Sequence, residues 1–161
     1  MRRLLALTCI LSGLPFAAAA QEYDAGGWQG WSHKNNATGG FVSCTVSARY
    51  DSGQSIVFAI NANKAFVVAL GNQAWKLKIG AFYPARLTID GNDFGTTRLQ
   101  AYDESKARIV VPYTADALNR FRKGYILRIE TPERKIPYQL AGSGKALDWL
   151  RDCFRKAAPA R

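Results

Sequence analysis

The residues that could support catalysis are few, and their spacing does not form an active-site pattern. The sequence has a single histidine, His33, in a stretch rich in Gly and Asn. A Ser-His-Asp triad would require this histidine to meet both an orienting acid and a nucleophile, and no G-x-S-x-G elbow is present. Gly142-Ser143-Gly144 has similar letters, but Ser143 stands where the N-cap of a helix is expected. We therefore expect a protein that is not an enzyme.

Metal and cofactor sites are not indicated either. A zinc site needs three or four close Cys, His or carboxylate ligands, which one histidine and two paired cysteines cannot supply. The segment Asp90-Gly91-Asn92-Asp93 resembles the start of a calcium loop, but its twelfth position is Ala101 instead of Glu, so we predict a turn. The close acid pairs, Asp103 with Glu104 and Asp148 with Asp152, are flanked by Lys or Arg, which lower a carboxyl pKa. We expect no bound cofactor.

Basic charge is the stronger signal. The chain carries 22 Lys and Arg against 12 Asp and Glu, a net charge of +10. Such a surface attracts polyanions, which for an exported protein means an anionic envelope polymer, a lipid headgroup or an envelope protein, and not nucleic acid. A surface that is merely basic and solvated is the alternative. The candidate anion-binding residues lie on one predicted strand, at one helix end and along the last helix: Lys76, Lys78, Arg120, Arg122, Lys123, Arg151, Arg155 and Lys156.

Two tryptophans near the start of the chain are candidate partner-binding residues. Trp28 and Trp31 are three positions apart, so on a strand they would face opposite ways. Either could stack on a sugar ring or on a partner. Tryptophan also commonly fills the core of a small domain, which is the interpretation that we favour.

The first twenty residues have the pattern of a secretory signal peptide: basic residues at Arg2 and Arg3, an apolar run and a final stretch of alanines. No later stretch reaches the length of about 18 apolar residues that a membrane span requires. We therefore predict a periplasmic or secreted protein with a mature net charge of about +8. Cys9 leaves with the signal peptide, and the remaining pair, Cys44 and Cys153, predicts one disulfide in an oxidising compartment.

The rest of the chain predicts one β-rich domain over residues 21–157, followed by a disordered tail at 158–161. Residues 21–40 are expected to be a loose segment. Short alternating or β-branched runs separated by turn residues predict eight or nine antiparallel strands in a sandwich or barrel. A short helix is expected at 114–123, with Thr114 as its N-cap, and a C-terminal helix from about residue 143 should pack on one face of the sheet. The predicted strands are 41–50, 55–60, 65–70, 75–79, 85–89, 98–102, 107–111, 125–130 and 135–140.

The C-terminal third, mainly residues 118–153, resembles a known family. The strand at 125–129 and the segment Tyr138-Gln139-Leu140-Ala141-Gly142-Ser143-Gly144-Lys145-Ala146-Leu147 are similar to the ending of the invasion-associated locus B family of small exported proteobacterial proteins. The resemblance implies a β-sandwich-like domain that ends in a helix. It also implies a protein that is associated with the envelope and is not catalytic. We therefore expect a non-catalytic envelope protein that binds a polyanionic component or a protein partner. An inhibitor of an extracellular hydrolase such as a lysozyme is the alternative.

Overall fold

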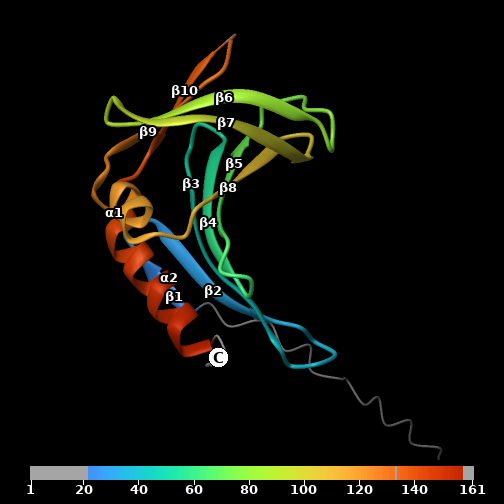
Figure 1. Cartoon of the computed structure of the whole chain (residues 1–161), viewed down its shortest axis with the longest axis vertical. Helices are drawn as coiled ribbons and strands as arrows, with labels where there is room; N and C mark the ends of the chain where they lie inside the picture. Colours follow the sequence, from blue (N-terminus) through green and yellow to red (C-terminus); the bar gives the residue numbers. More distant parts are fainter. Residues whose placement is uncertain (1–21, 133, 158–161) are drawn as a thin grey trace, which may run out of the picture.

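The computed structural model describes residues 22–132 and 134–157, so the predicted signal peptide and tail lie outside the described residues. The mainly β prediction is confirmed: ten antiparallel strands form one sheet, accompanied by two helices (Figure 1). Neither helix of the described chain is long and apolar enough to cross a bilayer. The elements are β1 (Tyr23–Ala25), β2 (Trp28–Lys34), β3 (Phe41–Arg49), β4 (Gln54–Asn61), β5 (Phe66–Asn72), β6 (Phe82–Ile89), β7 (Asn92–Asp103), β8 (Lys106–Val111), α1 (Ala115–Lys123), β9 (Ile126–Glu130), β10 (Lys135–Gln139) and α2 (Ser143–Ala157).

The sheet is strongly curved but is not closed into a barrel. Its strand order is β1-β2-β3-β4-β5-β8-β7-β6-β9-β10, and the two edge strands, β1 and β10, do not pair. Figure 1 shows β6 and β7 crossing above the ends of β3, β4 and β5. Side chains bridge the seam between β10 and the β3–β4 turn, because the Tyr50 hydroxyl donates to the Gln139 carbonyl and the Gln54 amide donates to the Pro137 carbonyl. Of the two predicted architectures, the barrel is therefore wrong.

Both helices lie on the same side of β2, β3 and β4 (Figure 1). The inward positions of β3, β4 and β5 alternate as the sequence predicted, with Cys44, Val46 and Ala48 buried on β3. In α2 the buried positions form a stripe, namely Ala146, Leu147, Leu150 and Phe154, which places this helix on the sheet as expected. An aromatic cluster of Trp28, Phe58, Phe66, Phe94 and Phe121 fills the space beneath α1.

The predicted disulfide is confirmed. Cys44 of β3 is bonded to Cys153 of α2, and the Cα atoms of the two residues are 6.2 Å apart. The bond fastens the C-terminal helix to the middle of the sheet. Ser143, in contrast, is not the cap that we predicted, because it is the first residue of α2 and its buried hydroxyl donates to the carbonyl of Phe121, 2.9 Å away in α1.

The prediction of a loose segment at 21–40 is wrong for residues 23–34, whereas residues 35–40 do form a loop. Residues Tyr23–Ala25 and Trp28–Lys34 form the antiparallel pair β1–β2, joined at Gly26 and Gly27, whose φ angles of 61° and 79° suit a tight turn. Gly30 has a packing role, since a Cβ atom there would come within 2.8 Å of the Trp149 ring of α2. The glycines that suggested a loop therefore build a hairpin turn and a close contact between helix and strand.

The predicted strand at 75–79 is also wrong, although burial does alternate over residues 75–78 before the exposed Ile79. Trp75 and Leu77 are half-buried, whereas Lys76 and Lys78 are exposed. The Leu77 amide donates to the Glu104 carbonyl in the β7–β8 turn, and the segment has no neighbouring strand in the sheet. Alternating burial thus arises here from an extended loop that lies against the sheet without joining its ladder.

Candidate functional site

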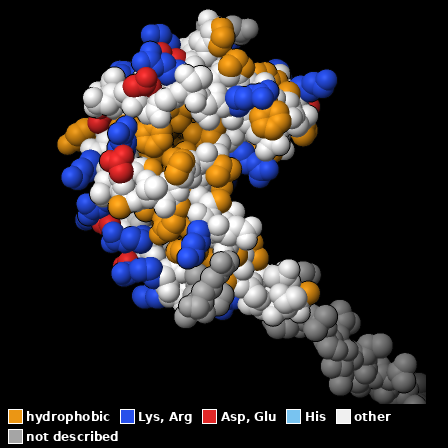
Figure 2. Space-filling view, in the orientation of Figure 1, with side chains coloured by type: hydrophobic (Ala, Val, Ile, Leu, Met, Phe, Trp, Pro, Cys, Tyr) orange, Lys and Arg blue, Asp and Glu red, His pale blue; other side chains and the backbone are white. Residues whose placement is uncertain are grey.

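The face of the sheet opposite the helices carries small side chains at its centre. Strand register places Ser47, Val57 and Ala69 side by side across β3, β4 and β5 on this outward face. A solvated face would ordinarily carry long polar side chains, because those lose least by exposure. Figure 2 shows that the molecule is hollowed on the side away from α1 and α2. The small residues and the hollow together indicate a surface that can receive another molecule.

The next row of the same face has a cation at each end. Register aligns Arg49 of β3 with Ser55 of β4, Ser55 with Gly71 of β5, and Gly71 with Lys106 of β8. Three strand spacings separate Arg49 from Lys106, which puts their Cα atoms about 14 Å apart. Gly71 keeps the row open, since an added Cβ atom would lie 2.3 Å from the Ser55 hydroxyl oxygen and 3.6 Å from Lys106 Cγ. We call this row and the depression around it the cationic groove.

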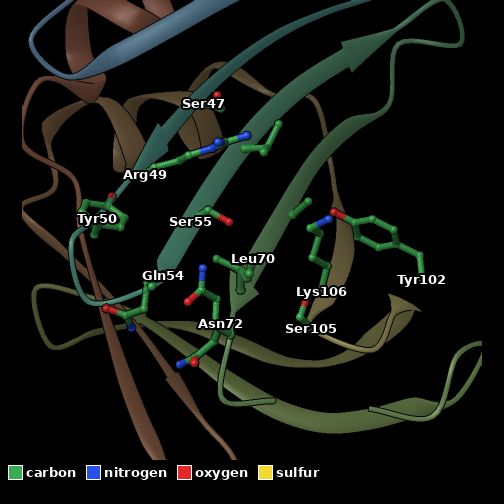
Figure 3. A pocket seen from close by; sticks show the side chains of 15 residues that line it. Ser47, Arg49, Tyr50, Gln54, Ser55, Leu70, Asn72, Tyr102, Ser105 and Lys106 are labelled. Atoms are coloured by element: carbon green, nitrogen blue, oxygen red, sulfur yellow. The ribbon is translucent and has the colours of Figure 1, made fainter. Parts of the chain in front are cut away.

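The cationic groove has a volume of about 560 Å³, and most of the residues that line it are polar (Figure 3). Ser47, Gln54 and Asn72 contribute hydroxyl and amide groups, and Tyr102 flanks the groove with a ring that is 41% exposed. Burial raises the pKa of Tyr102, so its hydroxyl stays neutral and available for hydrogen bonding. Of the described residues that line the groove, none is His, Cys, Asp or Glu. Its described lining supplies two cations together with hydroxyl and amide groups, which can bind a polar anionic molecule.

The two cations at the ends of the groove, Arg49 and Lys106, differ in whether they have a carboxylate partner. Arg49 makes no ion pair within the described chain. Lys106 Nζ lies 3.7 Å from a carboxylate oxygen of Asp103. Hydrogen bonds from the hydroxyl and amide of Ser105 hold the pKa of that carboxyl below its usual range. Asp103 thus binds Ser105 through one carboxylate oxygen and pairs with Lys106 through the other, and the ammonium group of Lys106 keeps further donors for the groove.

Four of the predicted anion-binding residues are occupied by carboxylates. Arg122 of α1 donates two hydrogen bonds of 2.9 Å to Asp148 of α2, so it ties the two helices together. The remaining pairs are Arg120 with Asp116 at 3.0 Å, Arg151 with Asp148 at 3.4 Å and Arg155 with Asp152 at 2.8 Å. Figure 2 shows this mixture of blue and red side chains along the helical side. These arginines have structural partners, and their role in anion binding stays a prediction.

The four predicted lysines lie in three separate places. Lys76 and Lys78 belong to the loop before β6, Lys123 ends α1, and Lys156 lies near the end of α2. None of them forms an ion pair with a described residue. The structure therefore does not bring the eight predicted cations together into one site.

The two candidate tryptophans face opposite sides of β2, as their spacing predicted. Trp28 is 1% exposed, stacks on Phe58 and donates its indole N–H to the Ala141 carbonyl at 2.8 Å. This burial leaves it no surface for a partner. Trp31 is half-buried on the outward face, directly opposite Thr45 of β3. The Thr45 hydroxyl also bonds to the sole histidine, because His33 Nε2 lies 2.9 Å from its oxygen.

Sequence reasoning missed the cationic groove, although one signal for it was present. Strands β4 and β5 are apolar or small on both faces, as in Ser55-Ile56-Val57-Phe58-Ala59-Ile60. A strand that is apolar on both faces is typical of one covered on both sides. Here one side is the core and the other is the floor of the groove. Of the cations at its ends, Arg49 lies close to Asp51 and Lys106 follows the acidic pair Asp103-Glu104, so neither belongs to a run of basic residues that would have given a signal.

Comparisons with known proteins support the fold. No family model matches the sequence, and no curated protein matches it. Among solved structures, the chain is similar to invasion associated protein B from Bartonella henselae, with a TM-score of 0.58 and 17% sequence identity. The match covers 83% of this chain and 97% of that chain. The fold resemblance therefore extends from the C-terminal third to nearly the whole described domain, and at this identity it concerns the fold alone.

Proposed function

We propose that the protein is a non-catalytic binding protein of the bacterial envelope that holds an acidic glycan in its cationic groove. The observation that carries this proposal is the row Arg49–Ser55–Gly71–Lys106, in which two cations flank a floor of small residues on an otherwise open sheet face. A cation at each end of the row matches a chain that carries repeated negative charges. The signal peptide predicted for residues 1–20 supports the envelope context.

The chemistry of the lining favours a sugar polymer as the anionic partner. Arg49 and Lys106 can bind the carboxylate or phosphate groups of the polymer by charge-assisted hydrogen bonds. The side chains of Gln54, Asn72 and Ser47 offer donors and acceptors for sugar hydroxyls. Tyr102 presents a partly exposed ring at one side, the kind of amphipathic contact that a sugar face uses. An open groove with few charges should bind a single repeat weakly, so an oligomer that reaches both Arg49 and Lys106 should bind more tightly than one sugar unit.

The test compares the groove with the helical face. Binding of an oligomeric polyuronate is measured by calorimetry for the parent protein and for two charge-matched double variants, Arg49→Gln/Lys106→Gln and Arg151→Gln/Lys156→Gln. We expect the groove variant to lose affinity at least about tenfold, which corresponds to about 1.4 kcal/mol, while the helical variant stays near the parent. Binding should also weaken from 50 mM to 500 mM salt, because exposed charges are screened.

Two results would contradict the proposal. Equal loss in both double variants would mean that the polymer follows net charge alone, as the solvated basic surface predicts. Unchanged affinity in the groove variant, with loss only in the helical variant, would move the site to the residues that the sequence singled out. A neutral dextran of the same length serves as the control ligand. Inhibition of an extracellular hydrolase stays a prediction from the sequence.

A further inference from the structure

A second hollow in the molecule has a chemistry different from that of the cationic groove. It lies between the extended loop at 73–81, strand β6 and the β9–β10 hairpin, and has a volume of about 480 Å³. Its floor is formed by inward residues of the sheet, among them Leu99, Ala107 and Ile129, which are each at most 3% exposed. A site of this size with a mostly hydrophobic lining is typical of small-molecule binding sites. We call it the apolar hollow.

The walls of the apolar hollow are also apolar. Trp75 and Leu77 line it from the loop, and Ile136 lines it from β10. All three are only partly buried, although each packs against the core. This explains the alternation of the loop without a strand: Trp75 and Leu77 face the hollow, Lys76 lies at its rim and Lys78 does not line it. The hollow is therefore an extension of the core that stays open to the outside.

Two cations lie at the rim of this apolar space. Lys76 and Arg134 both line the hollow and are exposed, and neither side chain forms an ion pair with a described residue. The described residues that line the hollow include no acid. An apolar interior with positive charge at its mouth complements a molecule that has an apolar chain and a negatively charged end.

We propose that the apolar hollow binds the alkyl chain of an anionic amphiphile, with the acid group of the ligand at Lys76 and Arg134. The chain would lie against Trp75, Leu77 and Ile136, and the ammonium and guanidinium groups would face the carboxylate or phosphate. This site is separate from the cationic groove and does not depend on glycan binding. The ligand could be a free fatty acid or the acyl part of a membrane lipid, and both share this chemistry.

The first experiment measures binding of monomeric alkanoates from octanoate to dodecanoate. Because each methylene buried should strengthen binding by about fourfold, affinity should rise steeply with chain length. A 1-alkanol of matched length should bind more weakly than the alkanoate. An alkanoate that carries bromine on its chain should quench tryptophan emission by contact, and Trp75→Phe should remove most of this quenching. Trp149→Phe is the control, since Trp149 packs on Tyr23 and does not line the hollow.

The second experiment tests the rim charges with a matched control on the same loop. Lys76→Gln and Arg134→Gln should each weaken alkanoate binding at least about threefold and leave alkanol binding unchanged. Lys78→Gln should change neither, because Lys78 lies two residues further along the loop and does not line the hollow. Thermal unfolding of each variant verifies that it is folded. Anionic vesicles then distinguish the two ligand sources: co-sedimentation that depends on Trp75 assigns a membrane lipid, and binding of monomeric acid alone assigns a free fatty acid.

The proposal fails if affinity does not depend on chain length, or if quenching survives in Trp75→Phe. It also fails if Lys76→Gln and Lys78→Gln weaken binding equally, since that would reflect net charge and not the hollow. These outcomes leave the glycan proposal untouched, because none of the residues tested lines the cationic groove.

Discussion

Reduction of the disulfide between Cys44 and Cys153 should destabilise the domain strongly without unfolding it at 25 °C. The bond closes a loop of 109 residues, for which the chain-entropy model gives about 4 to 5 kcal/mol. A domain of this size has a free energy of unfolding of about 5 to 15 kcal/mol, so the reduced protein should stay folded. The buried stripe of α2, centred on Leu150, should still hold the helix on the sheet.

Urea unfolding with and without a reductant measures this effect. If the free energy of unfolding falls by about 2 kcal/mol for each M of urea, the unfolding midpoint should fall by roughly 2 M on reduction. The slope of this dependence should rise slightly, because the reduced unfolded chain is less compact. The double variant Cys44→Ala/Cys153→Ala is the control: its midpoint should resemble that of the reduced protein and should not respond to the reductant. A midpoint shift below about 0.5 M, with both thiols shown to be free, would refute the loop-entropy reasoning.

Three further predictions concern single positions. Leu150→Ala should cost about 2 to 5 kcal/mol, because the residue is fully buried, whereas Arg151→Ala next to it should stay within about 0.5 kcal/mol; urea midpoints check both values. Burial raises the pKa of Tyr50 to about 12, so the folded state keeps this proton while the unfolded chain loses it near pH 10. The free energy of unfolding should therefore fall as the pH rises from about 10 to 12. In the Tyr50→Phe variant it should fall less steeply over the same pH range, which unfolding measured at a series of pH values checks. Gly124→Ala should destabilise by about 1 to 3 kcal/mol in the same urea assay, since an added Cβ atom would lie 2.4 Å from Ile89 Cγ2; an unchanged midpoint would mean that Ile89 moves aside freely.

Local pattern predicted most of the fold, and failed where packing partners were distant in sequence. The helix at 115–123 follows from its cap, because the Thr114 hydroxyl accepts from the Ala117 amide at 3.1 Å as expected. The disulfide followed from cysteine count and compartment. The β1–β2 hairpin could not be predicted by the same means, since Gly30 is required by the ring of Trp149, more than a hundred residues away.

The cationic groove was beyond sequence reasoning for a related reason. Its end residues, Arg49 and Lys106, share a row only because β5 pairs with β8, which is not the next strand along the chain. The interval between those strands holds β6 and β7, which turn away to cross the top of the sheet. The alternation along a strand shows on which face of the sheet a residue lies. Which residues of other strands lie beside it depends on the order of the strands in the sheet.

The net positive charge of this protein does not by itself show which cations can bind an anion. That depends on whether each cation already has a carboxylate partner. On the helical side, Asp148 and Asp152 bind arginines, and the pair Arg122–Asp148 joins α1 to α2. A ligand that approaches this side must compete with carboxylates already in place. Arg49 in the cationic groove and Lys76 at the apolar hollow have no such competitor among the described residues. Cations without a carboxylate partner among the described residues thus also lie where the sheet offers a floor, which is polar in one case and apolar in the other, and the floor decides which anion can bind there.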